Sequence, residues 1–290
     1  FCGNSGKIRI TDFSLLFMKY QGIYFMKKTL IALAVAASAA VSVSGSAMAW
    51  TQSGTGGNVN IGGTLTPAEV TPWEVWIGTG VQDLNSLVAK GDTSVTIDVQ
   101  KAVPVLGIRT VAKESFNGKV GISPQISYGS GVALDGFNAG VTTLTLDIND
   151  KTNQTKIGSV SVPFSAAAVA SWDNPSNGNK GYRALYAANS GDGFFGGLGK
   201  SADKVAISHA ALNLINDLNP DFSSNFNDLG LTIGTSFAQT ENFQSAVVKH
   251  SAYYGSGIQA GAKATITLDN AVGDNAIEWE ASLPVTVSYQ

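Results

Sequence analysis

The residues whose types and spacing could support catalysis or nucleotide binding form incomplete motifs. Residues 196–201 match the end of a phosphate-binding loop, but the full motif needs a glycine five residues before Gly199, where this chain has Phe194. The Gly-x-Ser-x-Gly pattern of a nucleophile elbow is absent from the sequence. The two histidines, His209 and His250, stand in a helical and a strand pattern, where a lone histidine is usually structural. The sequence therefore predicts no catalytic residue, and we expect a protein that is not an enzyme.

Acidic residues gather in two short stretches that match known sites only in part. Asp147, Asn149 and Asp150 occupy the first positions of a calcium-binding loop, but the remaining ligand positions do not follow. A hairpin turn explains them better. Glu278 and Glu280 could form the carboxylate pair of a glycosidase, although alternating acids more often mark the solvated face of a strand. We predict neither a metal ion nor a cofactor, and a hydrolase is only the third hypothesis.

Aromatic side chains beside polar ones offer a different chemistry in the stretch 172–243. A sugar ring is bound by flat apolar faces together with neighbouring hydrogen-bonding groups. The alternative is that these rings only close a small core within the stretch. The candidate carbohydrate-binding residues are Trp172, Asp173, Tyr182, Arg183 and Tyr186.

Short alternating segments separated by turn residues dominate the chain and predict an all-β fold in one domain. The first of them is a strand at 72–78. A two-turn helix is predicted at 81–90, with Gly91 as its stop. The stretch 172–243 interrupts this rhythm with loops and a helical pattern from Ser201 to Leu218. It is therefore interpreted as an insertion into a sheet scaffold.

The stretch 58–66, NVNIGGTLT, alternates as a strand does but has no neighbouring hairpin partner. A strand with an apolar face and unpaired backbone edges must join a sheet. Its apolar side chains are Val59, Ile61 and Leu65, with Gly57 and Gly63 as small positions on the same face. At the other end, the chain finishes in a second alternating strand formed by Leu283, Val285, Val287 and Tyr289.

Residues 26–49 read as a secretory signal peptide, with a basic start, an apolar centre and a small-residue cleavage site before Trp50. The alternative, a transmembrane anchor, needs about 20 apolar residues, more than this centre provides. Residues 1–25 precede the initiating Met26 and are interpreted as upstream sequence outside the natural protein. We then expect an amino-terminal extension at 50–66 and one domain at 67–290.

The charge and cysteine content limit the partners of this protein. Residues 1–49 contain five Lys or Arg and one Asp, so their removal changes the formal net charge from −3 to −7. An acidic surface disfavours binding to nucleic acid and to anionic lipid. The only cysteine, Cys2, is removed with the leader, so a protein exported to an oxidising compartment would be stabilised by its core alone.

Several of these stretches together resemble the FaeG-like major subunits of chaperone–usher fimbriae. The matching sequences are the leader MKKTLIALAVAASAAVS, the start GNVNIGGTLT, the run WEVWIGTG, KIGSVSV at 156–162, and the ending from Ser251 through Trp279 to LPVTVSY. The resemblance covers both ends and much of the sheet scaffold. It fades between about Trp172 and Phe243.

The resemblance implies an incomplete immunoglobulin-like sandwich whose missing strand is supplied by the amino-terminal extension of the next identical subunit, that is, by donor-strand complementation. It also implies a periplasmic chaperone that first pairs with the strand Leu283–Tyr289, and an outer-membrane usher that exchanges the chaperone for the next subunit. Recognition of host-cell glycoconjugates is assigned in such subunits to the inserted region. The expected location is the surface fimbria. The alternative is a purely structural pilin whose adhesin is a separate tip protein.

Overall fold

The computed structural model describes residues 61–64, 71–231 and 237–290. The chain divides into two units, Phe1–Thr66 and Pro67–Gln290. In the first unit the described residues 61–64 lie in no helix or strand, and their side chains are exposed. The second unit contains every helix and strand described below.

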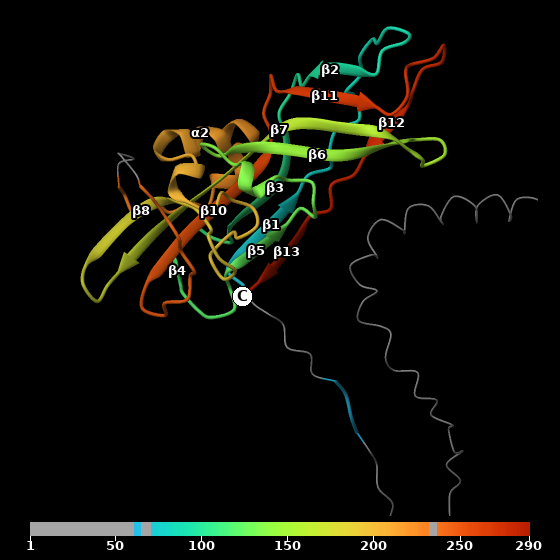
Figure 1. Ribbon diagram of the computed structural model, residues 1–290. Helices are drawn as coiled ribbons and strands as arrows, with labels where there is room; N and C mark the ends of the chain where they lie inside the picture. The colour runs from blue at the N-terminus through green and yellow to red at the C-terminus, as the bar shows by residue number, and fades with distance from the viewer. Residues whose placement is uncertain (1–60, 65–70, 232–236) are drawn as a thin grey trace, which may run out of the picture. The chain divides into compact units, whose positions relative to one another are not determined.

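Antiparallel strands make up most of the regular structure of the second unit (Figure 1). The all-β class predicted from the sequence is therefore confirmed, and the strand predicted at 72–78 is β1. The strands are β1 (Trp73–Ile77), β2 (Ser94–Asp98), β3 (Val103–Thr110), β4 (Phe116–Asn117), β5 (Pro124–Ser127), β6 (Val141–Asp150), β7 (Lys156–Asn174), β8 (Asn179–Leu185), β9 (Ala238–Gln239), β10 (Lys249–Ile258), β11 (Lys263–Leu268), β12 (Trp279–Ala281) and β13 (Thr286–Tyr289).

The helices are few and short: the 3-10 helices η1 (Leu134–Gly136), η2 (Ala202–Lys204) and η3 (Pro220–Ser223), and the α-helix α2 (Ser208–Leu218). The helix predicted from Ser201 begins seven residues later than expected, because η2 and an extended stretch precede it. The helix predicted at 81–90 is wrong, since these residues form no helix. Two isolated helical turns are marginal in water, and here Leu84 packs on the main core from a non-helical connection.

The main sheet follows the order β1-β3-β10-β7-β11-β2, with β6 and β8 also paired to β7. All these pairs are antiparallel. The single parallel pair described joins β8 to β9. A second sheet contains β5 and β13, in which Val287 lies opposite Ile126. The last strand, β13, therefore belongs to a different sheet from β1, the first strand described.

Strand β7 is 19 residues long and organises the whole sheet. Its first half pairs with β6 and β11, and its second half pairs with β10 and β8. Successive side chains of a strand point to opposite faces. Ala166, Ala168 and Ala170 accordingly belong to the main core between the two sheets, whereas Ala167 and Val169 belong to a smaller core on the other face.

The smaller core is formed where α2 and η3 cover the outer face of β7 and β10 (Figure 1). Ala211 and Ile215 of α2 and Phe222 of η3 are buried there against Tyr253 of β10. Gly107 permits this close packing, because a Cβ atom on it would lie 2.3 Å from the ring of Phe222. The helical part of the insertion and the main core therefore lie on opposite faces of one sheet.

Candidate assembly groove and insertion surface

A long apolar groove of about 920 Å³ opens into the main core. Its lining comes from the inner faces of β2, β3, β6, β7 and β11, and from two chain segments at its rims, 77–88 and 272–285. The apolar lining residues include Ile77, Leu84, Val88, Val95, Ile97, Val99, Val103, Val105, Leu144, Leu146, Ile148, Val160, Val162, Ile258, Ala264, Ile266, Leu268, Val272, Trp279, Leu283 and Val285. An exposed apolar surface of this extent is typical of an interaction site.

The inner face of β1 shows that this core is not closed. Trp73 is buried in the main core, whereas Val75 and Ile77, which alternate with it on the same face, are exposed. Ile77 has 53 % of its surface exposed and lines the groove. Side chains that a complete sandwich would bury therefore face an open space.

Both rims of the groove contain backbone that belongs to no strand within the described residues. On one side, the Gly78 amide donates to the Val105 carbonyl at 2.8 Å and the Gly91 amide to the Val272 carbonyl at 2.9 Å. The connection between these two anchors is neither helix nor strand. On the other side, residues 282–285 separate β12 from β13. Unpaired backbone at both rims allows a further strand to form hydrogen bonds there.

The predicted carboxyl-terminal strand lies along this second rim. Leu283, Val285, Val287 and Tyr289 are half-buried, alternate with exposed residues and pack against the main core. Only Val287 and Tyr289 lie within β13, and Leu283 and Val285 line the groove ahead of it. Pro284 has no amide hydrogen to donate to a ladder, which accounts for the late start of β13. Burial raises the pKa of Tyr289.

Of the five residues predicted for the amino-terminal donor strand, Ile61 and Gly63 are described, and Gly57, Val59 and Leu65 lie outside the described residues. The side chain of Ile61 is 95 % exposed. An added Cβ atom on Gly63 would meet no other atom within 4 Å. In this single chain, the apolar face of residues 61–64 is therefore uncovered.

Within the insertion, Trp172 and Arg183 come together as one contact. The Arg183 guanidinium carbon lies 4.0 Å from the centroid of the Trp172 ring, a separation typical of cation–π contacts. The ring lies across Gly181, where a Cβ atom would be 2.4 Å from it. Phe237, which is 51 % exposed, meets the Trp172 ring at 6.5 Å. Arg183 also pairs with Glu241 at 3.3 Å and donates to the Gln239 side chain.

The other predicted carbohydrate residues are not all beside this contact. Asp173 follows Trp172 by one position in β7, and Tyr182 precedes Arg183 by one position in β8. The alternation of the two strands therefore turns Asp173 and Tyr182 to the opposite face. Tyr182 packs there against the smaller core. Tyr186 follows β8, and its amide donates to the Gln239 carbonyl at 3.2 Å. The structure thus divides these five residues between the two faces.

The sequence did not predict that His250 and Glu241 would lie beside the contact between Trp172 and Arg183. His250 of β10 lies opposite Trp172, its side chain is 1 % exposed, and neither ring nitrogen has a hydrogen-bond partner among the described residues. Its Nδ1 atom is 3.9 Å from Glu241 Oε2. Burial lowers the pKa of His250, and the nearby Glu241 carboxylate opposes this shift only in part. His250 is therefore neutral at pH 7.

The depressed pKa of His250 predicts a loss of stability in mild acid. In the unfolded chain a histidine binds a proton near pH 6.5, whereas in the folded chain it does so only at lower pH. The unfolded state then binds more protons, so the free energy of unfolding is highest above pH 6.5 and decreases as the pH falls below it. We expect His250→Phe to flatten this decrease in urea titrations between pH 7 and 5.

The exposed His209 of α2 provides the control for this measurement. We expect His209→Gln to keep the slope of the wild-type protein. An unchanged slope in His250→Phe would show that other groups cause the acid sensitivity.

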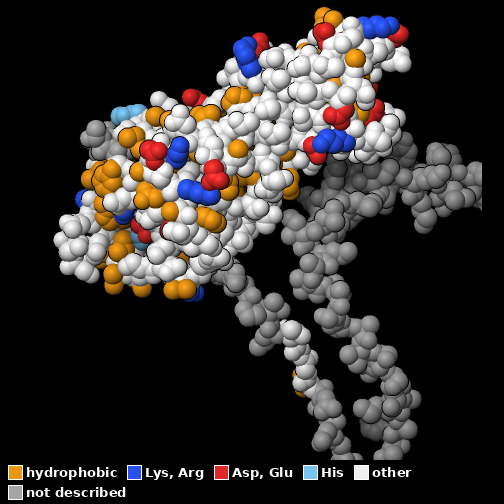
Figure 2. Space-filling model, in the orientation of Figure 1, with side chains coloured by type: hydrophobic (Ala, Val, Ile, Leu, Met, Phe, Trp, Pro, Cys, Tyr) orange, Lys and Arg blue, Asp and Glu red, His pale blue; other side chains and the backbone are white. Residues whose placement is uncertain are grey.

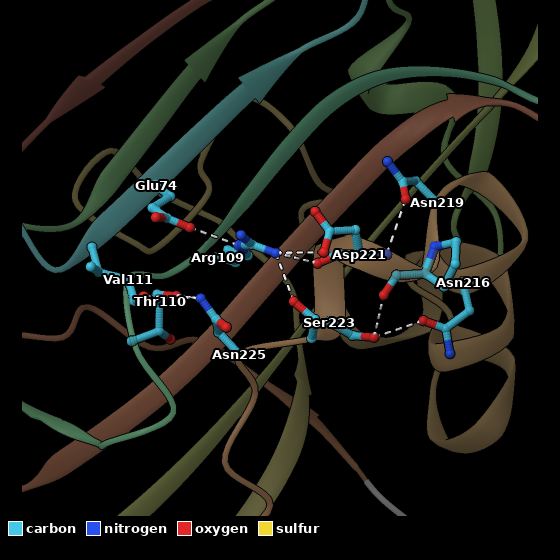
Figure 3. A network of polar contacts seen from close by, with 11 residues as sticks. Glu74, Arg109, Thr110, Val111, Asn216, Asn219, Asp221, Ser223 and Asn225 are labelled. Carbon is cyan, nitrogen blue, oxygen red and sulfur yellow. Dashed lines mark hydrogen bonds and ion pairs between the residues drawn. The ribbon is translucent and has the colours of Figure 1, made fainter.

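Arg109 of β3 fastens the insertion to the outer face of the sheet (Figure 3). Its Nε atom donates to Glu74 of β1 at 2.8 Å, and Nη1 lies 2.9 Å from Asp221 Oδ1 in η3. The hydrogen bond that Arg109 donates to the Glu74 carboxylate is the main cause that raises the pKa of Arg109. Asn225 extends the network by donating to the carbonyls of Thr110 and Val111, both at 3.0 Å. These contacts join β1, β3 and η3 into one outer surface.

Residues of the incomplete phosphate-loop, calcium-loop and glycosidase motifs make ordinary structural contacts. Lys200 pairs with Asp135 at 2.6 Å. The Asp150 carboxylate accepts the amide of Thr152 at 2.8 Å, as expected for a turn, and Glu280 accepts from Gln154 at 2.8 Å. Among the described residues, no group of three or more potential ligands could hold a metal ion. No helix in the described part of the chain is long and apolar enough to cross a membrane.

The fold and the groove define a class of all-β subunit whose core is open on one side. The chain matches, over residues 26–290, the family described as "Fimbrial, major and minor subunit", and it belongs to that family. It is 32 % identical to K88 fimbrial protein AC of Escherichia coli, over 91 % of this chain and 100 % of that protein. It is 28 % identical to the F41 fimbrial protein of Escherichia coli, again over 91 % of this chain and 100 % of that protein.

The resemblance to K88-type fimbrial subunits seen in the sequence is therefore confirmed. These relatives are structural proteins of fimbriae and not enzymes. The chain is accordingly a subunit of the surface fimbria, and its family membership implies polymerisation into fibres.

Proposed function

We propose that this subunit polymerises by donor-strand complementation. The amino-terminal extension of one copy enters the groove of the next, with Val59, Ile61 and Leu65 directed to the groove floor and Gly57 and Gly63 at narrow positions. The observation that carries the proposal is the open apolar groove, whose two rims have backbone in no strand among the described residues. Burying a Val, Ile or Leu side chain contributes about 1.5–3 kcal/mol. Three such side chains and a backbone ladder hold neighbouring subunits together.

The proposal extends to the export of the subunit and to the proteins that cover its groove before assembly. The signal peptide at 26–49 directs the chain to the periplasm, where a chaperone covers the groove by pairing along Leu283–Tyr289. An outer-membrane usher then replaces the chaperone with the extension of the next subunit. An apolar groove of this size left uncovered favours aggregation, which supports the need for a chaperone before assembly.

Moving the donor segment within the chain tests this proposal. Residues 50–66 are removed from the front and joined to the carboxyl terminus by a flexible linker, so that the chain can fill its own groove. We expect a stable monomer that folds without chaperone and forms no fibres, measured by sizing chromatography and thermal unfolding. A control in which the transplanted segment carries arginine at Ile61 should remain unstable. Equal stability of both proteins would contradict the proposal.

Adhesion to host-cell glycoconjugates is the second function that we propose for the fibre. Its support is the position of the insertion, whose helices cover the face of the sheet opposite the groove. This face stays free when the groove is filled. In Figure 2, apolar side chains gather over the end of the molecule that holds α2, β8 and β10. The Trp172 and Arg183 contact is the candidate sugar surface at that end, and it lies on the face of β7 and β8 opposite α2.

A glycan array with purified fibres tests adhesion. Binding to a defined set of glycans is the expected result. Binding to none would favour the alternative, a purely structural pilin with a separate tip adhesin, and turnover of a glycan would revive the hydrolase hypothesis.

A further inference from the structure

The stretch of chain between the proposed donor strand and its own domain is short. Seven residue steps separate Leu65 from Pro72, which directly precedes β1. An extended chain advances by at most about 3.6 Å per residue, so these two residues are at most about 25 Å apart. The domain is much longer, because β7 alone has 19 residues and a strand rises about 3.3 Å per residue. In a fibre, one end of each domain therefore lies close to the groove that holds its extension.

A hydrogen bond to Pro72 shows which end of the domain this is. The Val111 amide donates to the Pro72 carbonyl at 2.9 Å, so the segment that follows β3 lies beside the linker. The side chains of Val111, Ala112 and Lys113 are exposed there. The carboxyl terminus lies at the same end (Figure 1). We call Val111, Ala112 and Lys113 the linker-side surface.

The opposite end of the domain, where β12 pairs with the end of β6, also exposes apolar side chains (Figure 1). The two rims of the groove converge there, because the Gly91 amide donates to the Val272 carbonyl at 2.9 Å. Leu87 of one rim is 98 % exposed, and Ile277 of the other rim is exposed as well. Glu278 follows Ile277 and is also exposed. We call Leu87, Ile277 and Glu278 the far-end surface.

The direction of the donor strand decides which end of the acceptor its domain meets. The acceptor's own linker and carboxyl terminus are already at the linker side. A donor that left the groove there would bring both neighbours of a subunit to one end. A donor that leaves at the far end places its domain against the far-end surface and keeps the other end for the next acceptor. Contacts between two different surfaces of one protein, repeated without closure, build an open filament.

The charges of the two ends are complementary. Acids outnumber bases at the far end, where Asp147, Asp150, Asp269, Asp274, Glu278 and Glu280 lie with Lys90, Lys151 and Lys156. The segment 111–121 on the linker side has Lys113 and Lys119 with one acid, Glu114. Neither Lys113 nor Glu278 has an ion-pair partner among the described residues. Exposed ion pairs contribute little energy, but they orient approaching partners.

We propose that neighbouring domains of the fibre touch directly, with the linker-side surface of one copy resting on the far-end surface of the copy that holds its extension. Val111 packs against Leu87 and Ile277, and Lys113 lies opposite Glu278. The contact rests on the proposed donor-strand polymerisation and adds a second joint to it, which fixes the angle between the two domains. A small contact is enough, because the short linker gives the two surfaces a high effective concentration.

The contact is best tested from the linker side. Leu87, Ile277 and Glu278 also border the groove, whereas Val111 and Lys113 do not line it. Changes at the linker side therefore leave the donor site of the same subunit untouched.

A photo-crosslinking amino acid in place of Ala112 tests the contact in intact fibres. Illumination should join adjacent subunits, and mass spectrometry should locate the link in residues 84–91 or 272–278 of the other subunit. The same probe in place of Lys101 is the control. Lys101 is exposed in the turn between β2 and β3, away from both surfaces, and should give no such link.

Val111→Arg should make the fibres more flexible, because it places a charge against the apolar side chains of the contact. We expect the persistence length of the fibres in electron micrographs to fall at least twofold. Ile207→Arg introduces the same charge at another exposed apolar residue, beside the start of α2, and should leave the persistence length unchanged.

The possible failures are distinguishable. Fibres that give no link from Ala112, or a link to the linker side of the other subunit, would overturn the domain contact and leave donor-strand polymerisation in place. Val111→Arg fibres as stiff as wild-type fibres would also overturn the contact. Normal fibres from Ile61→Arg subunits would instead overturn the donor-strand proposal on which the contact rests.

Discussion

Ile61→Arg should abolish fibre formation while leaving the fold of the subunit intact. Ile61 is exposed in the single chain, so its replacement disturbs no buried side chain. In the proposed fibre the same position is buried in an apolar groove. An unpaired guanidinium there loses its hydration without gaining a partner, which costs several kcal/mol. Electron microscopy of the cell surface measures fibres, and periplasmic extracts measure subunit bound to chaperone.

A matched variant in the same strand shows whether the effect depends on the face of the donor. Asn60 alternates with Ile61 and is predicted to point away from the groove floor. We expect Asn60→Arg subunits to form fibres. Normal fibres from Ile61→Arg subunits would show that the donor-strand hypothesis is wrong.

Phe243→Ala should cause the largest loss of stability in the domain, about 3–5 kcal/mol, the usual cost of removing a buried aromatic side chain. Phe243 is completely buried, and its ring meets those of Trp73 at 5.1 Å, Phe194 at 6.0 Å and Phe116 at 6.0 Å. It therefore joins the end of the insertion to β1 and β4. Denaturant unfolding of the self-complemented monomer measures the change.

Phe237 is the control, since it belongs to the same part of the chain but is half exposed. Phe237→Ala removes the same atoms, and we expect it to change the free energy of unfolding by less than about 1 kcal/mol because surface substitutions usually have small effects. Similar losses in both variants would mean that the insertion is not fastened through Phe243.

The parts of the fold that depend on local alternation could be predicted from the sequence. Strand β1 and the alternating end of the chain fall where the pattern places them. The connection 79–90 was misread, because the spacing of Leu84 and Val88 fits one face of a helix and an extended rim equally well. Contacts with distant strands decide between the helix and the extended rim, and a local sequence pattern carries no information about such contacts.

The grouping of residues at the candidate sugar surface could not be predicted from the sequence for a different reason. Consecutive residues such as Trp172 and Asp173 are neighbours in the sequence, yet a strand turns them to opposite faces. In contrast, Arg183, Glu241 and His250 are far apart in the sequence and meet at one buried point.

The length of β7 has a mechanical consequence for the fibre. In the fibre proposed above, a pull along the fimbria reaches each subunit at its groove, which the first half of β7 helps to line through Val160 and Val162. The same unbroken strand continues into the half that carries α2 and the Trp172 contact. Tension is therefore passed along a covalent backbone rather than across a hinge. The surface proposed for adhesion and the joint between subunits are parts of one stiff element.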